Sequence, residues 1–138
     1  MIINIVDASN LERNLYLTMQ LLELDKPLVL ALNMMDEASK RGLVINTSKL
    51  SKELGASVVP IVASKKQGMN HLLDQVIKSV NSPSSKNIYY GQDIEHIIEK
   101  LIQYLTPLGN LKNIPLRWLA LKILEDDLYV VVLKMNNS

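Results

Sequence analysis

Residues 28–36 of the 138-residue chain read LVLALNMMD, an unbroken apolar run that passes into Asn33 and Asp36. A run that is apolar at every position, not at every second one, is typical of a strand covered on both faces. Pro27 stands directly before the run and is compatible with the start of a strand. We therefore predict a buried strand over residues 28–32, with Asn33 at its carboxyl end.

Two similar runs lie on either side of this strand in the sequence. Residues 2–6 and 57–62 are predicted as the first and third strands. Helix-period segments separate the strands and follow the third one, at about residues 10–24, 36–40, 47–54 (capped by Thr47 or Ser48) and 68–80. Strands that alternate with helices in this way indicate an α/β fold with a parallel sheet and right-handed crossovers.

The composition changes after the last of these helices. Residues 81–87 read NSPSSKN, which is typical of a linker. Beyond it, helical spacing predicts one helix capped by Asp93 and a second that begins at Pro115 and carries Trp118 as a core anchor. Residues 128–133 are compatible with either a helix or a strand. The predicted organisation is an α/β domain, a linker, a small all-helical domain and a tail, at residues 1–80, 81–87, 88–134 and 135–138.

The composition excludes several classes of function. Fifteen Lys and Arg residues against fourteen Asp and Glu give a net charge of +1, which argues against a nucleic-acid-binding surface. The chain has no Cys, so it has no disulfide, no thiolate metal site and no cysteine nucleophile. No apolar run approaches the roughly 18 residues of a membrane-spanning helix.

The Asn-x-x-Asp spacing of Asn33 and Asp36 has a specific chemical use. Ligands of parallel sheets bind beyond the carboxyl ends of the strands. There a carboxylate can accept two parallel hydrogen bonds, from the ring N–H and the exocyclic amine of guanine, which adenine does not offer in that arrangement. The alternative is that both residues only cap the next helix, and the local pattern leaves the two readings open.

The candidate guanine site draws on two loops. The Asn33 amide can both donate and accept, and Met34 offers an apolar stem to lie on a base. Backbone N–H groups after the third strand are positioned to bond the base oxygen. The predicted guanine-binding residues are Asn33, Met34, Asp36, Ala63, Ser64 and Lys65.

Other polar residues carry weaker predictions. Asp7 follows the first strand and is expected to cap the helix after it rather than to reach a nucleotide. His71 has no second ligand at a suitable spacing. His96 with Glu99, and the acidic run 125–127, are expected to be solvated rather than to bind a metal. We therefore predict no metal site and no catalytic residue.

Several stretches resemble the ferrous iron transport protein B family. Residues 4–15 (NIVDASNLERNL) and 20–24 (QLLEL) are similar to the segment after the second switch of its guanine-nucleotide domain. Residues 33–36 (NMMD) look like its base-reading motif, with Met where most GTPases have Lys. Residues 59–64 (VPIVAS) resemble its next guanine loop.

The resemblance extends to the C-terminal part of the chain and departs from the family pattern at one position. Residues 117–125 (RWLALKILE) are similar to the end of the helical domain that follows the family's guanine-nucleotide domain. Ala63 stands where Ser is more usual, which leaves only a backbone role at that position. The resemblance covers nearly all of residues 2–128 and implies half of the parallel sheet of a phosphate-loop GTPase followed by that helical domain.

The resemblance also implies a function. The family's members are membrane transporters of Fe(II) with a regulatory GTP-binding region on the cytoplasmic side, and the helical domain is associated with holding GDP. Asn33 and Asp36 would read guanine, Ala63 and Ser64 would supply the adjoining loop, and GTP or GDP would be the ligand. Mg²⁺ is expected only in a complete domain.

The sequence contains no phosphate-loop motif, Gly-x-x-x-x-Gly-Lys-Ser/Thr. None of its five glycines precedes Lys, and none ends an Asp-x-x-Gly motif. We therefore expect the chain to be a fragment that binds nucleotide weakly or not at all and does not hydrolyse GTP. Its first strand would expose a sheet edge that belongs against the missing N-terminal half, which predicts self-association. The alternative is a protein-interaction module without a nucleotide role.

Overall fold

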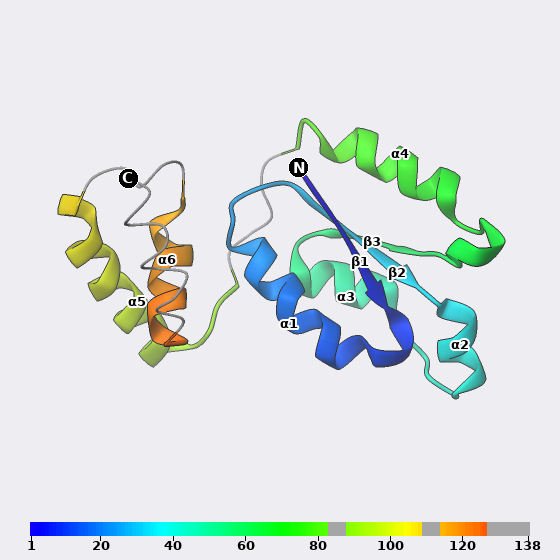
Figure 1. Cartoon of the computed structure of the whole chain (residues 1–138), viewed down its shortest axis with the longest axis horizontal. Coiled ribbons are helices and arrows are strands. Elements are labelled where there is room, and N and C mark those ends of the chain that lie inside the picture. Colours follow the sequence, from blue (N-terminus) through cyan, green and yellow to red (C-terminus); the bar gives the residue numbers. More distant parts are fainter. Residues whose placement is uncertain (83–87, 109–113, 127–138) are drawn as a thin grey trace. The chain divides into compact units, whose positions relative to one another are not determined.

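The computed structural model describes residues 1–82, 88–108 and 114–126. The chain divides into two compact units, residues 1–88 and the residues from Tyr89 onward (Figure 1). Within the described ranges, no helix is long and apolar enough to cross a membrane. Residues 83–87 of the predicted linker, the segment 128–133 and the tail 135–138 lie outside the described residues.

The first unit is built on a three-stranded parallel sheet in the order β1-β2-β3. The strands are β1 (Ile2–Asp7), β2 (Leu28–Asn33) and β3 (Ser57–Pro60). The register pairs Ile2 with Leu28 and Val29 with Ser57. The predicted α/β fold with a parallel sheet of about three strands is confirmed.

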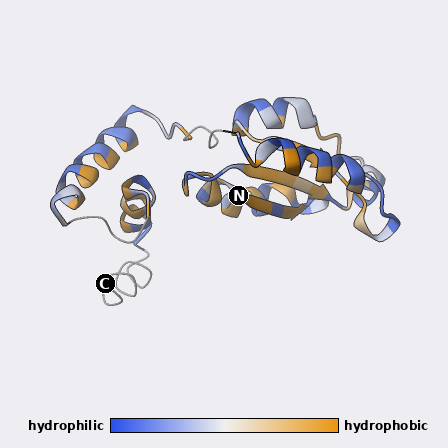
Figure 2. Cartoon of the chain, turned by 90° about the horizontal axis from the view of Figure 1, so that it is seen from above, coloured by the Kyte–Doolittle hydropathy of each residue, from blue (hydrophilic) through white to orange (hydrophobic). Residues whose placement is uncertain are grey.

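Helices cover both faces of this sheet, as the apolar strands predicted (Figure 1). On one face, α1 (Leu11–Leu22) and α3 (Thr47–Leu54) pack on a core that includes Leu22, Leu28, Leu30, Leu32 and Leu54. On the other face, α4 (Met69–Ser79) packs through Leu72 on Val29, Ala31, Val59 and Ile61. The strands are accordingly hydrophobic along their length (Figure 2).

The third strand is shorter than predicted. It ends at Pro60, two residues before the expected Val62. Val62 leaves the sheet because it pairs with Gln67 instead, in an antiparallel bridge with hydrogen bonds of 3.1 Å in both directions. This bridge closes the loop between β3 and α4, which carries half of the candidate site.

One edge of the sheet and part of α4 remain exposed. Ile3 and Ile5 lie in register with Val29 and Ala31, so they point to the face that α4 covers, yet Ile5 is 63% exposed. Leu73 and Ile77 of α4 and Val80, the residue that follows the helix, are also exposed. The outer edge of β1 therefore lies beside uncovered apolar side chains.

The second unit is helical, with α5 (Gln92–Leu105), a 3₁₀ turn (Thr106–Leu108) and α6 (Leu116–Leu124). Its core comprises Ile98, Leu105, Leu119 and Ala120, and Trp118 is partly buried against it. Asp93, the predicted cap, lies in the first turn of α5, because the helix already begins at Gln92. Pro115 is the residue before α6 instead of its first residue.

Candidate functional site

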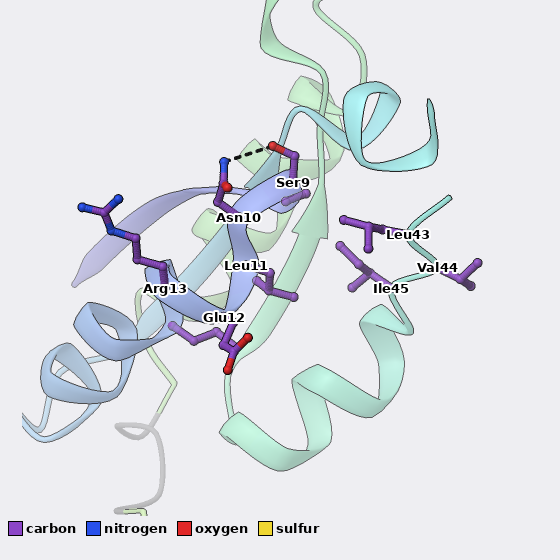
Figure 3. A pocket seen from close by; sticks show the side chains of 10 residues that line it. Ser9, Asn10, Leu11, Glu12, Arg13, Leu43, Val44 and Ile45 are labelled. Carbon is purple, nitrogen blue, oxygen red and sulfur yellow. Dashed lines mark hydrogen bonds between the residues drawn. The ribbon is translucent and has the colours of Figure 1, made fainter. Parts of the chain in front are cut away.

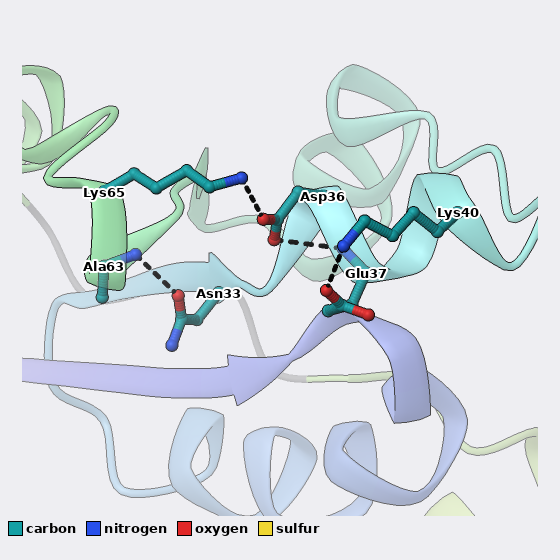
Figure 4. Close-up of polar contacts among 6 residues, drawn as sticks. All are labelled: Asn33, Asp36, Glu37, Lys40, Ala63 and Lys65. Atoms are coloured by element: carbon teal, nitrogen blue, oxygen red, sulfur yellow. Dashed lines mark hydrogen bonds and ion pairs between the residues drawn. The ribbon is translucent and has the colours of Figure 1, made fainter.

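The carboxyl end of β2 places Asn33 beside the loop that follows β3. After Asn33 the chain turns sharply, because Met34 adopts a left-handed backbone conformation with φ +62°, and α2 (Met35–Lys40) begins at once. The side-chain oxygen of Asn33 accepts a hydrogen bond from the Ala63 N–H at 3.0 Å (Figure 4). The two loops that the sequence analysis singled out are therefore tied together directly.

Four of the six predicted residues share one small hollow of about 320 Å³. The residues that line it are Asn33, Met34, Asp36, Glu37, Val62 and Ser64. Ala63 contributes its backbone N–H to Asn33, and Lys65 reaches Asp36 from the far loop. The structure thus brings all six predicted residues to the same end of the sheet.

The carboxylate of Asp36 is held from two sides. Its Oδ2 accepts from the Lys65 ammonium at 2.6 Å, and its Oδ1 accepts from the backbone N–H of Glu37 at 3.0 Å. The hydrogen bond from Lys65 lowers the pKa of the Asp36 carboxyl below its ordinary value of 3.8. Asp36 is therefore ionised at neutral pH and acts only as an acceptor.

The loop after β3 is a single 3₁₀ turn, Ala63–Lys65, followed by Gly68. The Ala63 N–H is used by Asn33 and the Lys65 N–H bonds the Val62 carbonyl at 3.1 Å. Within the described part of the chain, the N–H of Ser64 is the donor of this turn that no protein group accepts. Ser64 itself lines the hollow.

Gly68 ends this loop in a conformation that requires glycine. Its φ is +77°, and a Cβ there would lie 2.5 Å from the Pro60 carbonyl oxygen. The close approach allows the chain to return beside β3 and start α4 at Met69. Gly68 therefore supports the shape of the loop although it does not line the hollow.

Two lining residues were missed by the sequence analysis. Glu37 lies in the first turn of α2 and forms an ion pair of 2.7 Å with Lys40, its i+3 neighbour (Figure 4). That spacing is visible in the sequence and identifies the pair. Val62 lines the hollow because it leaves the sheet, for which the sequence offers no local signal.

Asp7 caps the 3₁₀ turn Ala8–Asn10 that precedes α1, and not α1 itself as predicted. Its carboxylate accepts from the Ser9 N–H at 2.8 Å, the Ser9 hydroxyl at 2.7 Å and the Asn10 amide at 2.7 Å. These bonds lower the pKa of the Asp7 carboxyl. Asp7 is in register with Asn33, but its oxygens are committed to the turn that starts α1.

A larger hollow of about 840 Å³ lies elsewhere in the first unit (Figure 3). It is lined by the segment Ala8–Arg13, Leu15 and the loop residues Leu43, Val44 and Ile45, and Val44 is 97% exposed. Its lining is mainly apolar, and none of the predicted guanine-binding residues takes part. Across the described ranges, no group of three His, Asp or Glu side chains is arranged to hold a metal.

Comparison with known families accounts for both units. Residues 1–76 match the family described as ferrous iron transport protein B, and residues 90–136 match the FeoB cytosolic helical domain. The chain is 39% identical over 132 residues to the Fe(2+) transporter FeoB of Escherichia coli (strain K12). It is 39% identical over 131 residues to the Fe(2+) transporter FeoB of Staphylococcus aureus (strain MSSA476). Each match covers 94% of this chain.

Solved structures agree. The cytosolic domain of L. pneumophila FeoB has a TM-score of 0.83 and 40% identity, over 95% of this chain and 56% of that one. A mutant of S. thermophilus NFeoB bound to GMPPNP has a TM-score of 0.80 and 35% identity, over 94% of this chain and 51% of that one. The chain spans only 16% of the E. coli transporter and 20% of the S. aureus one. On these matches, the chain belongs to the ferrous iron transport protein B family.

Proposed function

We propose that this chain carries the guanine-recognition half of the regulatory GTP-binding region of a ferrous iron transporter, on the cytoplasmic side of the membrane. In this proposal residues 1–80 read the base, and residues 81–87 connect them to a helical domain at 88–134. The observation that carries the proposal is the bond between Asn33 and the Ala63 N–H, which sets the Asp36 carboxylate and the Ser64 N–H around one hollow. Relatives of this fold have been solved with GDP and GMPPNP.

The hollow offers the complement of a guanine edge. The ionised Asp36 accepts from the ring N–H and the exocyclic amine of guanine, and the Ser64 N–H donates to the base oxygen. Met34, which is 40% exposed, covers a face of the base with its thioether stem. Adenine would set a ring-nitrogen acceptor against the carboxylate and an amine against the N–H, leaving polar groups unpaired.

The phosphates would contribute little in this chain. Its sequence has no Gly-x-x-x-x-Gly-Lys-Ser/Thr motif, whose backbone N–H groups and Lys cradle phosphates. We therefore propose weak binding carried by the base, with no GTP hydrolysis and no Mg²⁺ site in this chain. In the proposal, those functions require the rest of the transporter's GTP-binding region.

The test is an amide NMR titration of the full chain with GMP and with AMP up to millimolar concentrations. GMP should shift the amide signals of residues 33–37 and 63–66 selectively, and AMP should not. Equal shifts with both nucleotides, or none with GMP, would contradict guanine recognition and favour a protein-interaction module without a nucleotide role.

A change of specificity gives the sharper control. Asp36→Asn replaces one acceptor by an amide N–H, which suits the 2-oxo group of xanthine in place of the 2-amino group of guanine. The variant should lose about tenfold in GMP affinity, the worth of one hydrogen bond to a charged group, and should bind XMP more tightly than the wild type does. Unchanged GMP affinity together with no gain for XMP would leave Asp36 as a helix cap only.

We also propose that the chain associates with itself through β1. Its outer edge has no strand partner among the described residues, and Ile3 and Ile5 are exposed beside it. Such an edge invites pairing with a further strand. In sedimentation velocity, the wild type should sediment as a concentration-dependent oligomer, and Ile5→Lys should shift it toward the monomer. A wild type that stays monomeric at every concentration would overturn this proposal.

A further inference from the structure

Lys65 occupies the part of Asp36 that a guanine base would need. Its ammonium lies 2.6 Å from Oδ2, across 29 residues of sequence, and no other ion pair described here reaches this carboxylate. The Lys65 side chain is 55% exposed and that of Asp36 is 24% exposed. The ion pair is therefore accessible to solvent, and its carboxylate belongs to a residue that lines the hollow.

The two oxygens of the Asp36 carboxylate can accept only a few hydrogen bonds in the plane of the group. Guanine presents two parallel N–H donors, and the bidentate arrangement needs one carboxylate oxygen for each. Each oxygen already accepts one bond, Oδ1 from the Glu37 N–H and Oδ2 from the Lys65 ammonium, and each retains a second lone pair. A base that needs one bond from each oxygen therefore competes with the Lys65 ammonium for Oδ2.

We infer that Lys65 is a built-in competitor for Asp36, an ion-pair latch that lowers guanine affinity because it competes with the base for Oδ2. The inference rests on the proposed function, because it concerns the same carboxylate. The latch is weak, since an exposed ion pair is screened by water and salt. It therefore adjusts affinity and exchange rather than blocking the site.

The neighbouring lysine provides a matched control. Lys66 carries the same charge one position further along the loop, and within the described residues it makes no ion pair. Removing either charge changes the net charge of the chain equally. A difference between Lys65→Gln and Lys66→Gln therefore isolates the contact with Asp36 from the general electrostatics of the loop.

The first measurement needs no ligand. The carboxyl carbon of Asp36 is titrated by NMR in the full-length wild type, Lys65→Gln and Lys66→Gln. The pKa of Asp36 should be higher in Lys65→Gln than in the wild type and unchanged in Lys66→Gln. An Asp36 pKa that does not respond to Lys65→Gln would overturn the latch whatever the nucleoside data show.

The second measurement uses guanosine, whose neutral sugar avoids attraction between phosphate and lysine. The initial slope of the amide shifts at residues 33–37 should be about threefold steeper in Lys65→Gln than in the wild type, as expected for loss of an exposed ion pair. Lys66→Gln should match the wild type. Lys65→Arg, which keeps an ion pair with Asp36, should not bind more tightly than the wild type.

Salt supplies an independent prediction. Raising the ionic strength from about 0.02 to about 0.5 M screens the latch and should steepen the guanosine response of the wild type but not that of Lys65→Gln. If the wild type binds guanosine in preference to adenosine and Lys65→Gln binds it equally or more weakly, the latch is wrong and the proposed function stands. If no variant responds to guanosine, the proposed function itself fails.

Discussion

Arg117 binds the carboxylate of Glu95 through two nitrogens, Nη1 to Oε2 at 2.7 Å and Nη2 to Oε1 at 2.9 Å. Both side chains are largely buried, and Glu95 also accepts from the Tyr90 N–H at 3.0 Å. The guanidinium lies 5.8 Å from the centre of the Tyr90 ring. This bidentate ion pair joins α6 to α5 and to Tyr90, which lies just before α5.

Arg117→Met should destabilise the helical unit by about 2 kcal/mol, the worth of a hydrogen-bonded charged pair, because Glu95 would be left with one backbone donor. Urea unfolding followed by the fluorescence of Trp118, the only tryptophan of the chain, reports this unit alone. Arg117→Lys keeps the charge without the paired geometry and should cost less. Equal stability of Arg117→Met and wild type would mean that apolar packing alone holds the two helices.

The same pair predicts a pH dependence. The bond from Arg117 lowers the pKa of Glu95 below its ordinary value of 4.5. A carboxyl with a lowered folded-state pKa contributes stability that is fully present above 4.5 and is lost as the pH falls through the folded-state value. The free energy of unfolding of the wild-type helical unit should therefore decrease as the pH falls below about 5. In Arg117→Met the part of this decrease that comes from Glu95 should be absent. Parallel pH profiles for the two proteins would contradict it.

Gly68→Ala should destabilise the first unit by about 2 kcal/mol or more, because it combines a left-handed backbone with a Cβ 2.5 Å from the Pro60 carbonyl. Gly42→Ala is the matched control. Gly42 has a similar φ of +74°, but its Cβ would meet nothing within 4 Å, so only the backbone cost of about 1 kcal/mol applies. Thermal unfolding followed by far-UV circular dichroism compares them, and equal losses would refute the steric argument.

Asn4 and Thr18 form a buried hydrogen bond of 2.8 Å that joins β1 to α1. Thr18→Val keeps the shape but leaves the Asn4 amide without this partner, and should cost about 2 kcal/mol. The double variant Asn4→Leu with Thr18→Val removes both polar groups and should recover much of that loss. A double-mutant cycle measured by chemical unfolding tests the pair, and strictly additive costs would show that the two groups do not interact.

Much of the fold followed from local patterns. The three apolar runs predicted three buried parallel strands, and β2 begins at the predicted Leu28. The residue that caps each helix could not be predicted as well from the sequence when several good capping residues stand next to one another. Thr47 or Ser48 was expected to cap α3, but Asn46 does so, because its side-chain oxygen accepts from the Lys49 N–H at 2.8 Å. Asn, Thr and Ser are all good caps, and their order in the sequence does not choose between them.

For the candidate site, too, some features could be predicted from the sequence and others could not. Asn33 and Asp36 were recognised from their spacing after a strand, and the loop at residues 63–65 from its place after the next strand. The ion pair between Lys65 and Asp36 was not foreseen, because it depends on the direction of two side chains from separate loops. Nor did the sequence indicate that Val62 would leave the sheet to pair with Gln67.

The hydrogen bond between Asn33 and Ala63 has a consequence for the order in which the protein folds. Its two residues are 30 positions apart, and β3 is the last strand of the sheet to be synthesised. The first 56 residues can pair β1 with β2, but they lack Ala63, whose N–H binds the Asn33 side chain in the structure. The hollow is therefore a late product of folding, and any local opening that detaches β3 dismantles it while the β1–β2 pair persists.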